Sequence, residues 1–139
     1  MQSLNARRRS RRGLATVEVA LVFPLLILLT FGVIEYGWMF LKQQQITNAA
    51  RQAVRVGAMP RATKAQIDAR VSQVMTTAGL GGSGYTTTVT PVDPSTLLPG
   101  QLLTVKVTVN YANITLADVS LLPAPATLSG TVVMAREGP

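Results

Sequence analysis

The feature that most constrains this fold is a long apolar run that follows a cluster of arginines. Five of the first twelve residues are Arg, residues 13–41 contain no Lys or Arg, and residues 19–34 carry no charge at all. As a helix, residues 14–41 would extend over about 42 Å, enough to cross a bilayer with some tilt. So small a chain could hardly cover such a helix on all sides. The sequence therefore predicts a transmembrane helix at 14–41.

The charges around the run predict its orientation. The arginine cluster precedes it, and Lys42 alone follows directly. By the positive-inside rule the N-terminus is expected in the cytoplasm and residues 42–139 outside. Residues 31–40 are bulky and include a Glu, which does not suit cleavage by signal peptidase after the run.

Composition excludes several kinds of chemistry. The chain has no His and no Cys, so Ser-His-Asp triads, thiol nucleophiles, imidazole or thiolate metal sites and disulfides are excluded. The net charge of +7 comes largely from the first twelve residues, because residues 13–139 carry 8 basic and 6 acidic groups. We expect no enzyme, no metal, no cofactor, no small-molecule substrate and no nucleic-acid partner.

Two carboxylates interrupt the apolar run. Glu18 and Glu35 would lie about 26 Å apart along a helix, too far for any paired acid/base mechanism. Glu35 is expected to reach the membrane interface beside Tyr36 and Trp38. Glu18 lies within the apolar segment, where a carboxylate is costly unless it is paired. It therefore calls for a partner such as the free α-amino group of a neighbouring chain.

The N-terminus resembles a class III signal peptide of type IV pilins and pseudopilins. Basic residues precede Gly13, an apolar helix begins at Leu14, and Glu18 is the fifth residue counted from Leu14. The resemblance implies that a prepilin peptidase cuts after Gly13 on the cytoplasmic side and leaves Leu14 as the new N-terminus. It also implies that the Leu14 ammonium of an adjacent subunit neutralises Glu18 and fixes the axial register.

Residues 13–58 more specifically resemble the TadE-like family of the Tad/Flp tight-adherence pilus. Three sequence elements carry this resemblance: Gly13 with Val17 and Glu18, Phe31 with Gly32, Glu35, Tyr36 and Gly37, and Asn48 with Ala49, Ala50 and Arg51. Major Flp pilins usually carry a Glu-Tyr pair, whereas Val19 follows Glu18 here, and they are much shorter. The resemblance thus implies a minor pseudopilin of the bacterial inner membrane, with other pilins or pseudopilins and the assembly machinery as partners.

Other positions along the helix are candidates for packing or for local loosening. Pro24 removes one backbone hydrogen bond. Residues 42–58 can continue the helix as a stem with a small-residue stripe. The stripe consists of Ile46, Ala49, Ala50, Ala53, Val54 and Gly57. It could pack on a neighbouring pseudopilin, together with the motif residue Asn48, or on the protein's own exported domain.

Residues 59–139 predict a small α+β module. Met59-Pro60 ends the stem, a capping box at Thr63–Gln66 begins a helix over 63–78, and alternating apolar residues predict antiparallel strands at 85–92, 103–111 and 128–136. Residues 114–126, apolar but interrupted by prolines, are either a loop over the sheet edge or a contact for another subunit. The expected organisation is a leader at 1–13, a span at 14–41, a stem at 42–58 and the module at 59–139.

One alternative function shares almost all of these features. An uncleaved, single-pass envelope protein could use its exported module to bind another protein or the cell wall. Gly13 and Glu18 distinguish the two, because a permanent anchor needs neither. Whether a pseudopilin of this kind is a filament subunit, a tip primer or an assembly factor stays open.

Overall fold

A computed structural model describes residues 3–116 and 123–138, and for residues 3–14 it describes the backbone alone. The chain divides into two compact units, Met1–Tyr36 and Gly37–Pro139, which are treated separately below. Part of the proline-containing segment expected to be a loop or a contact, residues 117–122, lies outside the described residues.

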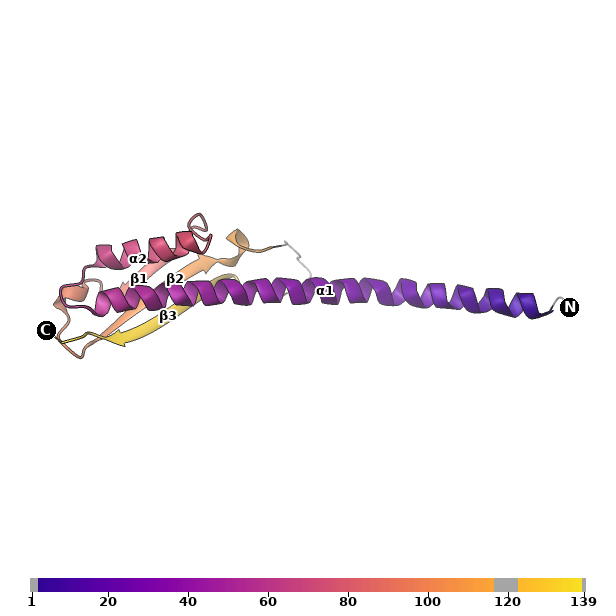
Figure 1. Cartoon of the computed structure of the whole chain (residues 1–139), viewed down its shortest axis with the longest axis horizontal. Coiled ribbons are helices and arrows are strands. Elements are labelled where there is room, and N and C mark those ends of the chain that lie inside the picture. Colours follow the sequence, from indigo (N-terminus) through magenta and orange to yellow (C-terminus); the bar gives the residue numbers. More distant parts are fainter. Residues whose placement is uncertain (1–2, 117–122, 139) are drawn as a thin grey trace. The chain divides into compact units, whose positions relative to one another are not determined.

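The elements follow the order helix, helix and three strands (Figure 1). They are α1 (Ser3–Ala58), α2 (Lys64–Thr77), β1 (Thr86–Thr90), β2 (Leu102–Asn110) and β3 (Thr127–Ala135), with short 3₁₀ helices at Pro94–Thr96 and Tyr111–Asn113. The predicted α+β class is confirmed. The apolar run and the stem form one uninterrupted helix, because nothing in 14–58 other than Pro24 breaks helical geometry.

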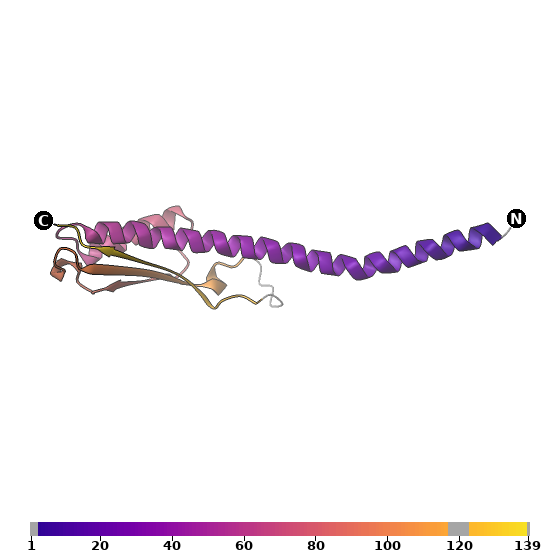
Figure 2. The same ribbon diagram turned by 90° about the horizontal axis from the view of Figure 1, so that it is seen from below.

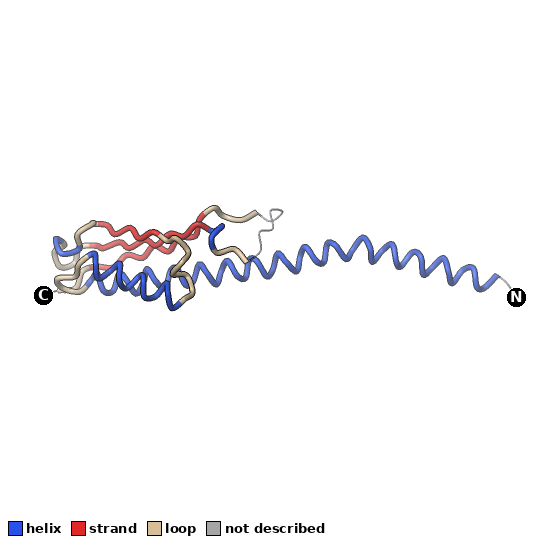
Figure 3. The backbone as a smooth tube through the Cα atoms, turned by 90° about the horizontal axis from the view of Figure 1, so that it is seen from above, coloured by secondary structure: helices blue, strands red, loops and turns tan. Residues whose placement is uncertain are grey.

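The second unit has two layers. Its sheet is antiparallel in the order β1-β2-β3, and both α2 and the C-terminal part of α1 lie on the same side of it (Figure 3). The registers place Val89 opposite Val105 and Val105 opposite Val132. Since side chains alternate along a strand, these apolar residues share the face that is turned to the helices.

The core between the layers draws on every element. It contains Ile46, Ala49, Ala50, Ala53 and Val54 of α1, Ile67, Val71 and Met75 of α2, Val89 of β1, Leu103, Val105, Val107 and Val109 of β2, and Leu128 of β3. Two glycines allow α1 and the sheet to approach each other closely. A Cβ on Gly130 of β3 would lie 2.6 Å from Thr47 Cα, and one on Gly57 would lie 2.4 Å from Leu103 Cδ2. Residues 42–58 of α1 are therefore an integral part of the second unit.

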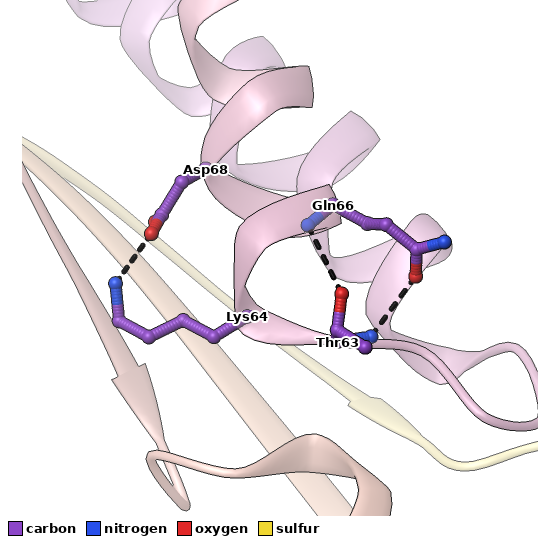
Figure 4. Close-up of polar contacts among 4 residues, drawn as sticks. All are labelled: Thr63, Lys64, Gln66 and Asp68. Carbon is purple, nitrogen blue, oxygen red and sulfur yellow. Dashed lines mark hydrogen bonds and ion pairs between the residues drawn. The ribbon is translucent and has the colours of Figure 1, made fainter.

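Local sequence signals set the limits of α2. The Thr63 hydroxyl accepts a hydrogen bond from the Gln66 backbone N–H, and the Gln66 side chain accepts one from the Thr63 N–H (Figure 4). Lys64 and Asp68 form an ion pair one turn apart, drawn in the same view. Beyond the last turn, Gly79 adopts φ +70°, a backbone conformation that glycine tolerates best. The predicted capping box is confirmed.

Candidate functional site

The first unit exposes apolar side chains on every side of the helix. All residues from 15 to 31 are exposed, including Leu21, Leu25 and Leu29. Among the described residues, one helix is long and apolar enough to cross a membrane, and it covers Ala15–Ala58. A helix that is apolar all round is stable only when lipid or other chains surround it.

The motif at the start of the span lies within this helix. Gly13 and Leu14 have helical backbone. Glu18 is exposed among Val17, Val19 and Leu21. Leu14 and Glu18 are four residues apart and therefore share one helix face. From the sequence, Glu18 is expected to pair with a cation from a neighbouring chain, and this pairing stays a prediction.

Pro24 lies inside α1, where it cannot donate a backbone hydrogen bond. Figure 2 shows that the ribbon of α1 curves in its N-terminal half. Proline is the usual cause of a bend in a helix, and the described part of this half contains no other proline. Thr30 also donates its hydroxyl to the carbonyl of Leu26, a contact that bends helices slightly.

The second motif element contains both buried and exposed positions. Gly32 is buried, and Glu35 is 7% exposed. The position of Glu35 at a membrane interface stays a prediction. Tyr36 and Gly37 are exposed, and a Cβ on Gly37 would meet nothing within 4 Å. Gly37 is thus open to a larger residue on steric grounds.

Sequence reasoning missed a cluster just after this element. In the second unit, the indole N–H of Trp38 donates to the carbonyl of Ile114, with Nε1 and O 2.7 Å apart. The Lys42 ammonium lies 4.3 Å from the centroid of the Trp38 ring, and Lys42 is 8% exposed. This cation–π contact and hydrogen bond fix the chain after β2 to α1. Lys42 had been read only as a flanking charge, since nothing local indicates a contact with residue 114.

The third motif element divides between the two faces of α1. Ala49, Ala50 and Ala53 are fully buried in the core, whereas Asn48 is exposed. Of the two packing possibilities for the small-residue stripe, the structure shows packing on the protein's own module. Asn48 borders three shallow grooves on the opposite face of α1.

The linings of these grooves combine amide, hydroxyl and guanidinium groups with apolar side chains such as Phe40, Met59 and Val74. One lies between α1 and α2 and includes Gln45, Gln52, Arg70 and Gln73. The others are bordered by Arg51, and one of them also by Arg55. In the described part of the chain, no group of three or more Asp and Glu residues is placed to hold a metal ion. The polar part of this surface combines the positive charge of arginines with amide groups, among them Gln45 Oε1, which is buried and unpaired among the described residues.

The family comparison finds its match in the first part of the chain. The profile of the TadE-like protein family matches residues 13–55. No curated protein and no solved structure matches the chain. The matched segment begins at Gly13 and ends at Arg55, so it covers the apolar span, both glutamates and the Asn48–Arg51 element. The resemblance read from the motifs is thereby confirmed for residues 13–55, which are similar to the TadE-like protein family.

Proposed function

We propose that this chain is a minor pseudopilin that acts in the assembly of a Tad/Flp-type pilus. The family match relates it to Tad pilus proteins. In this proposal it inserts into the bacterial inner membrane with its N-terminus in the cytoplasm, and a prepilin peptidase cuts it after Gly13. The mature chain then associates with other pilins or pseudopilins through its apolar helix, and it has no enzymatic role.

The observation that carries the proposal is the combination of exposure and motif in the first unit. Residues 15–31 are apolar and exposed on all sides, with the single carboxylate of Glu18 among them. Lipid alone would satisfy the apolar side chains, but it would offer the Glu18 carboxyl group no polar partner. A neighbouring helix that offers a cation satisfies both requirements.

Cleavage after Gly13 would create this cation. The new α-amino group of Leu14 lies one helical turn from Glu18 of its own chain and can reach Glu18 of an adjacent chain in a parallel bundle. Because a carboxylate and an ammonium buried in an apolar medium offset the cost of losing water only when they are in direct contact, the pair would select one axial offset between helices. The apolar contacts would supply attraction, and the ion pair would supply register.

Processing is tested by the intact mass and N-terminal sequence of the protein recovered from its host's membranes. The proposal predicts a chain that begins at Leu14. A Gly13→Leu variant is expected to keep Met1 and the arginine cluster, while Gly37→Leu, an equal change at an open position of the same helix, is expected to be cut normally. A wild-type chain that retains its leader beside an active prepilin peptidase would overturn the proposal.

Register is tested separately by Glu18→Gln. This variant is expected to be processed, because the cleaved bond precedes the altered residue, but to co-purify poorly with the other pilus components. Glu137→Gln removes an equal charge from the exposed end of the module and serves as the control. Unchanged assembly of a processed Glu18→Gln protein would remove the register mechanism.

The alternative, an uncleaved anchored protein whose module binds another protein or the cell wall, is favoured by a different observation. The stem packs within its own module, so the exported part has a core of its own without a neighbouring subunit. The mass measurement separates the two functions, since only the pseudopilin loses its leader.

A further inference from the structure

The face of the stem that points away from the core carries a defined set of polar groups. We call it the amide–arginine face, and its residues are Gln44, Asn48, Arg51, Gln52 and Arg55 of α1 with Arg70 and Gln73 of α2. Asn48, Arg51 and Arg55 follow at helical spacing and are exposed. The buried stripe of α1 lies on the opposite side. From the sequence, the small-residue stripe is the face expected to contact a partner or the protein's own domain.

The charge of this face is not compensated within the described part of the chain. Residues 36–67 contain five basic residues and no Asp or Glu. Arg51, Arg55 and Arg70 form no ion pair in the described ranges, where Lys64 pairs with Asp68 instead. Arginines on one face of a protein produce a positive potential that attracts carboxylates.

Hydrogen bonds within the face leave it rich in donors. The guanidinium of Arg70 donates to Gln52 Oε1 over 2.6 Å and to Gln73 Oε1 over 2.7 Å. Both amide oxygens therefore already accept a hydrogen bond, and the amide nitrogens, which can only donate, remain available. The guanidinium groups of Arg51 and Arg55 add planar pairs of donors suited to carboxylates.

From this geometry we infer that the amide–arginine face binds a carboxylate-bearing segment of a partner protein. The inference deepens the proposed function by naming the chemistry of its exported contact, and it rests on that function for the partner being part of the pilus apparatus. A membrane surface fits less well, because Gln52, Arg70 and Gln73 border a groove between α1 and α2 and are not on one flat exposed face.

A second copy of this chain is also a poor occupant. Residues 42–139 carry 8 basic and 4 acidic groups, so two modules repel each other. Of the acidic side chains, Asp68 is held by Lys64 and Asp93 accepts hydrogen bonds from Ser95. The exported module therefore offers few carboxylates that could complement its own arginines.

The test uses the full chain in membranes of its own host, with a photo-reactive residue in place of Asn48. We expect an adduct with another protein, and the crosslinked peptide is expected to contain several Asp or Glu residues. The same photo-reactive residue in place of Thr88, which is exposed on the sheet face away from the helices, is expected to give no such adduct.

Charge reversal then tests the chemistry. Arg51→Glu is expected to lower the yield of the Asn48 adduct at least about tenfold, whereas Lys106→Glu, the same change on the outer face of the sheet, leaves it unchanged. Replacing the partner's crosslinked carboxylates by Lys is expected to restore the yield with Arg51→Glu. Both residues are exposed, and the thermal unfolding midpoints of the variants verify that the module is intact.

Three outcomes would overturn the inference: no adduct from position 48, adducts with anionic lipid or with a second copy only, or a yield that is indifferent to Arg51→Glu. The intact mass of the chain in the same membranes reports independently on cleavage after Gly13. Failure of the docking face and failure of the pseudopilin function are therefore distinguishable.

Discussion

The two halves of α1 share one helical backbone but differ in what surrounds them. From residue 15 to 31 every side chain is exposed, and large apolar residues point in all directions. From residue 42 to 58 one face is buried in a core and the other carries amides and arginines. The side chains of the first half are exposed, while the buried face of the second half packs on a sheet and a second helix. The difference shows that helical structure alone does not reveal the environment that stabilises it.

The largest expected effect comes from truncating matched side chains in the two halves. Ile46→Ala removes a fully buried side chain from the core and should lower the free energy of unfolding of the module by about 2–5 kcal/mol. Leu29→Ala, at an exposed position of the same helix, should leave it unchanged. Thermal unfolding of the full chain in detergent, followed by near-UV circular dichroism, measures both. Equal destabilisation by the two variants would contradict the conclusion that only the C-terminal half of α1 belongs to the folded core.

A smaller effect is expected where the backbones of α1 and β3 approach. A Cβ on Gly130 would lie 2.6 Å from Thr47 Cα and 2.8 Å from Thr47 N, so helix and strand must move apart. Gly130→Ala should therefore cost about 1–3 kcal/mol of stability. Gly37→Ala, which has open space and gains helix propensity, should be neutral or stabilising. If Gly130→Ala unfolds at the wild-type temperature, the close packing of stem and sheet is incorrect.

The contact between α1 and the chain after β2 is expected to contribute less. Trp38→Phe keeps an aromatic ring beside Lys42 but removes the hydrogen bond to the carbonyl of Ile114, at a cost of about 1 kcal/mol. Amide hydrogen exchange near residue 114 should also accelerate. Exchange there that stays at the wild-type rate would show that Trp38 does not anchor this segment.

The smallest effect concerns a surface group far from α1 in sequence. The side-chain hydroxyl and the backbone N–H of Ser95 donate to Asp93 and hold the pKa of its carboxyl below the ordinary value of 3.8. This stabilisation is present above pH 3.8 and disappears as pH falls through the lowered pKa. As the pH falls through this range, the thermal unfolding midpoint of Asp93→Asn should therefore decrease slightly less than that of the wild type. An identical acid profile for both proteins would contradict the role of Ser95.

Much of the fold could be predicted because its signals are local. The alternation of Leu103, Val105, Val107 and Val109 indicated a strand with one buried face, and the capping box at Thr63 located the start of α2. The family motifs around Gly13 and Glu18 were also readable from the sequence. Each of these depends on residues close together in the chain.

The rest depends on long-range contacts that no local pattern contains. Small residues such as Ala49 and Ala50 suit an internal core and a subunit interface equally well, so the stem's partner stayed open. The anchoring of residue 114 by Trp38, and the arrangement of Arg70 with Gln52, bring together residues far apart in sequence. The amide–arginine face became visible only after the opposite face of α1 was assigned to the core.

The most direct test of the account measures what surrounds each half of α1 in a bilayer. Because the chain has no Cys, single spin labels can be placed at Leu25, Ala50 and Asn48 of the protein in liposomes without removing other thiols. The account predicts that the label at position 25 collides with oxygen but not with a water-soluble nickel complex. The label at 48 should collide with the nickel complex, and the label at 50 with neither. The central claim is that residues 15–31 face lipid while residues 42–58 belong to the folded module. A label at position 25 that collides with the nickel complex, or that collides with neither reagent in the isolated chain, would contradict this claim.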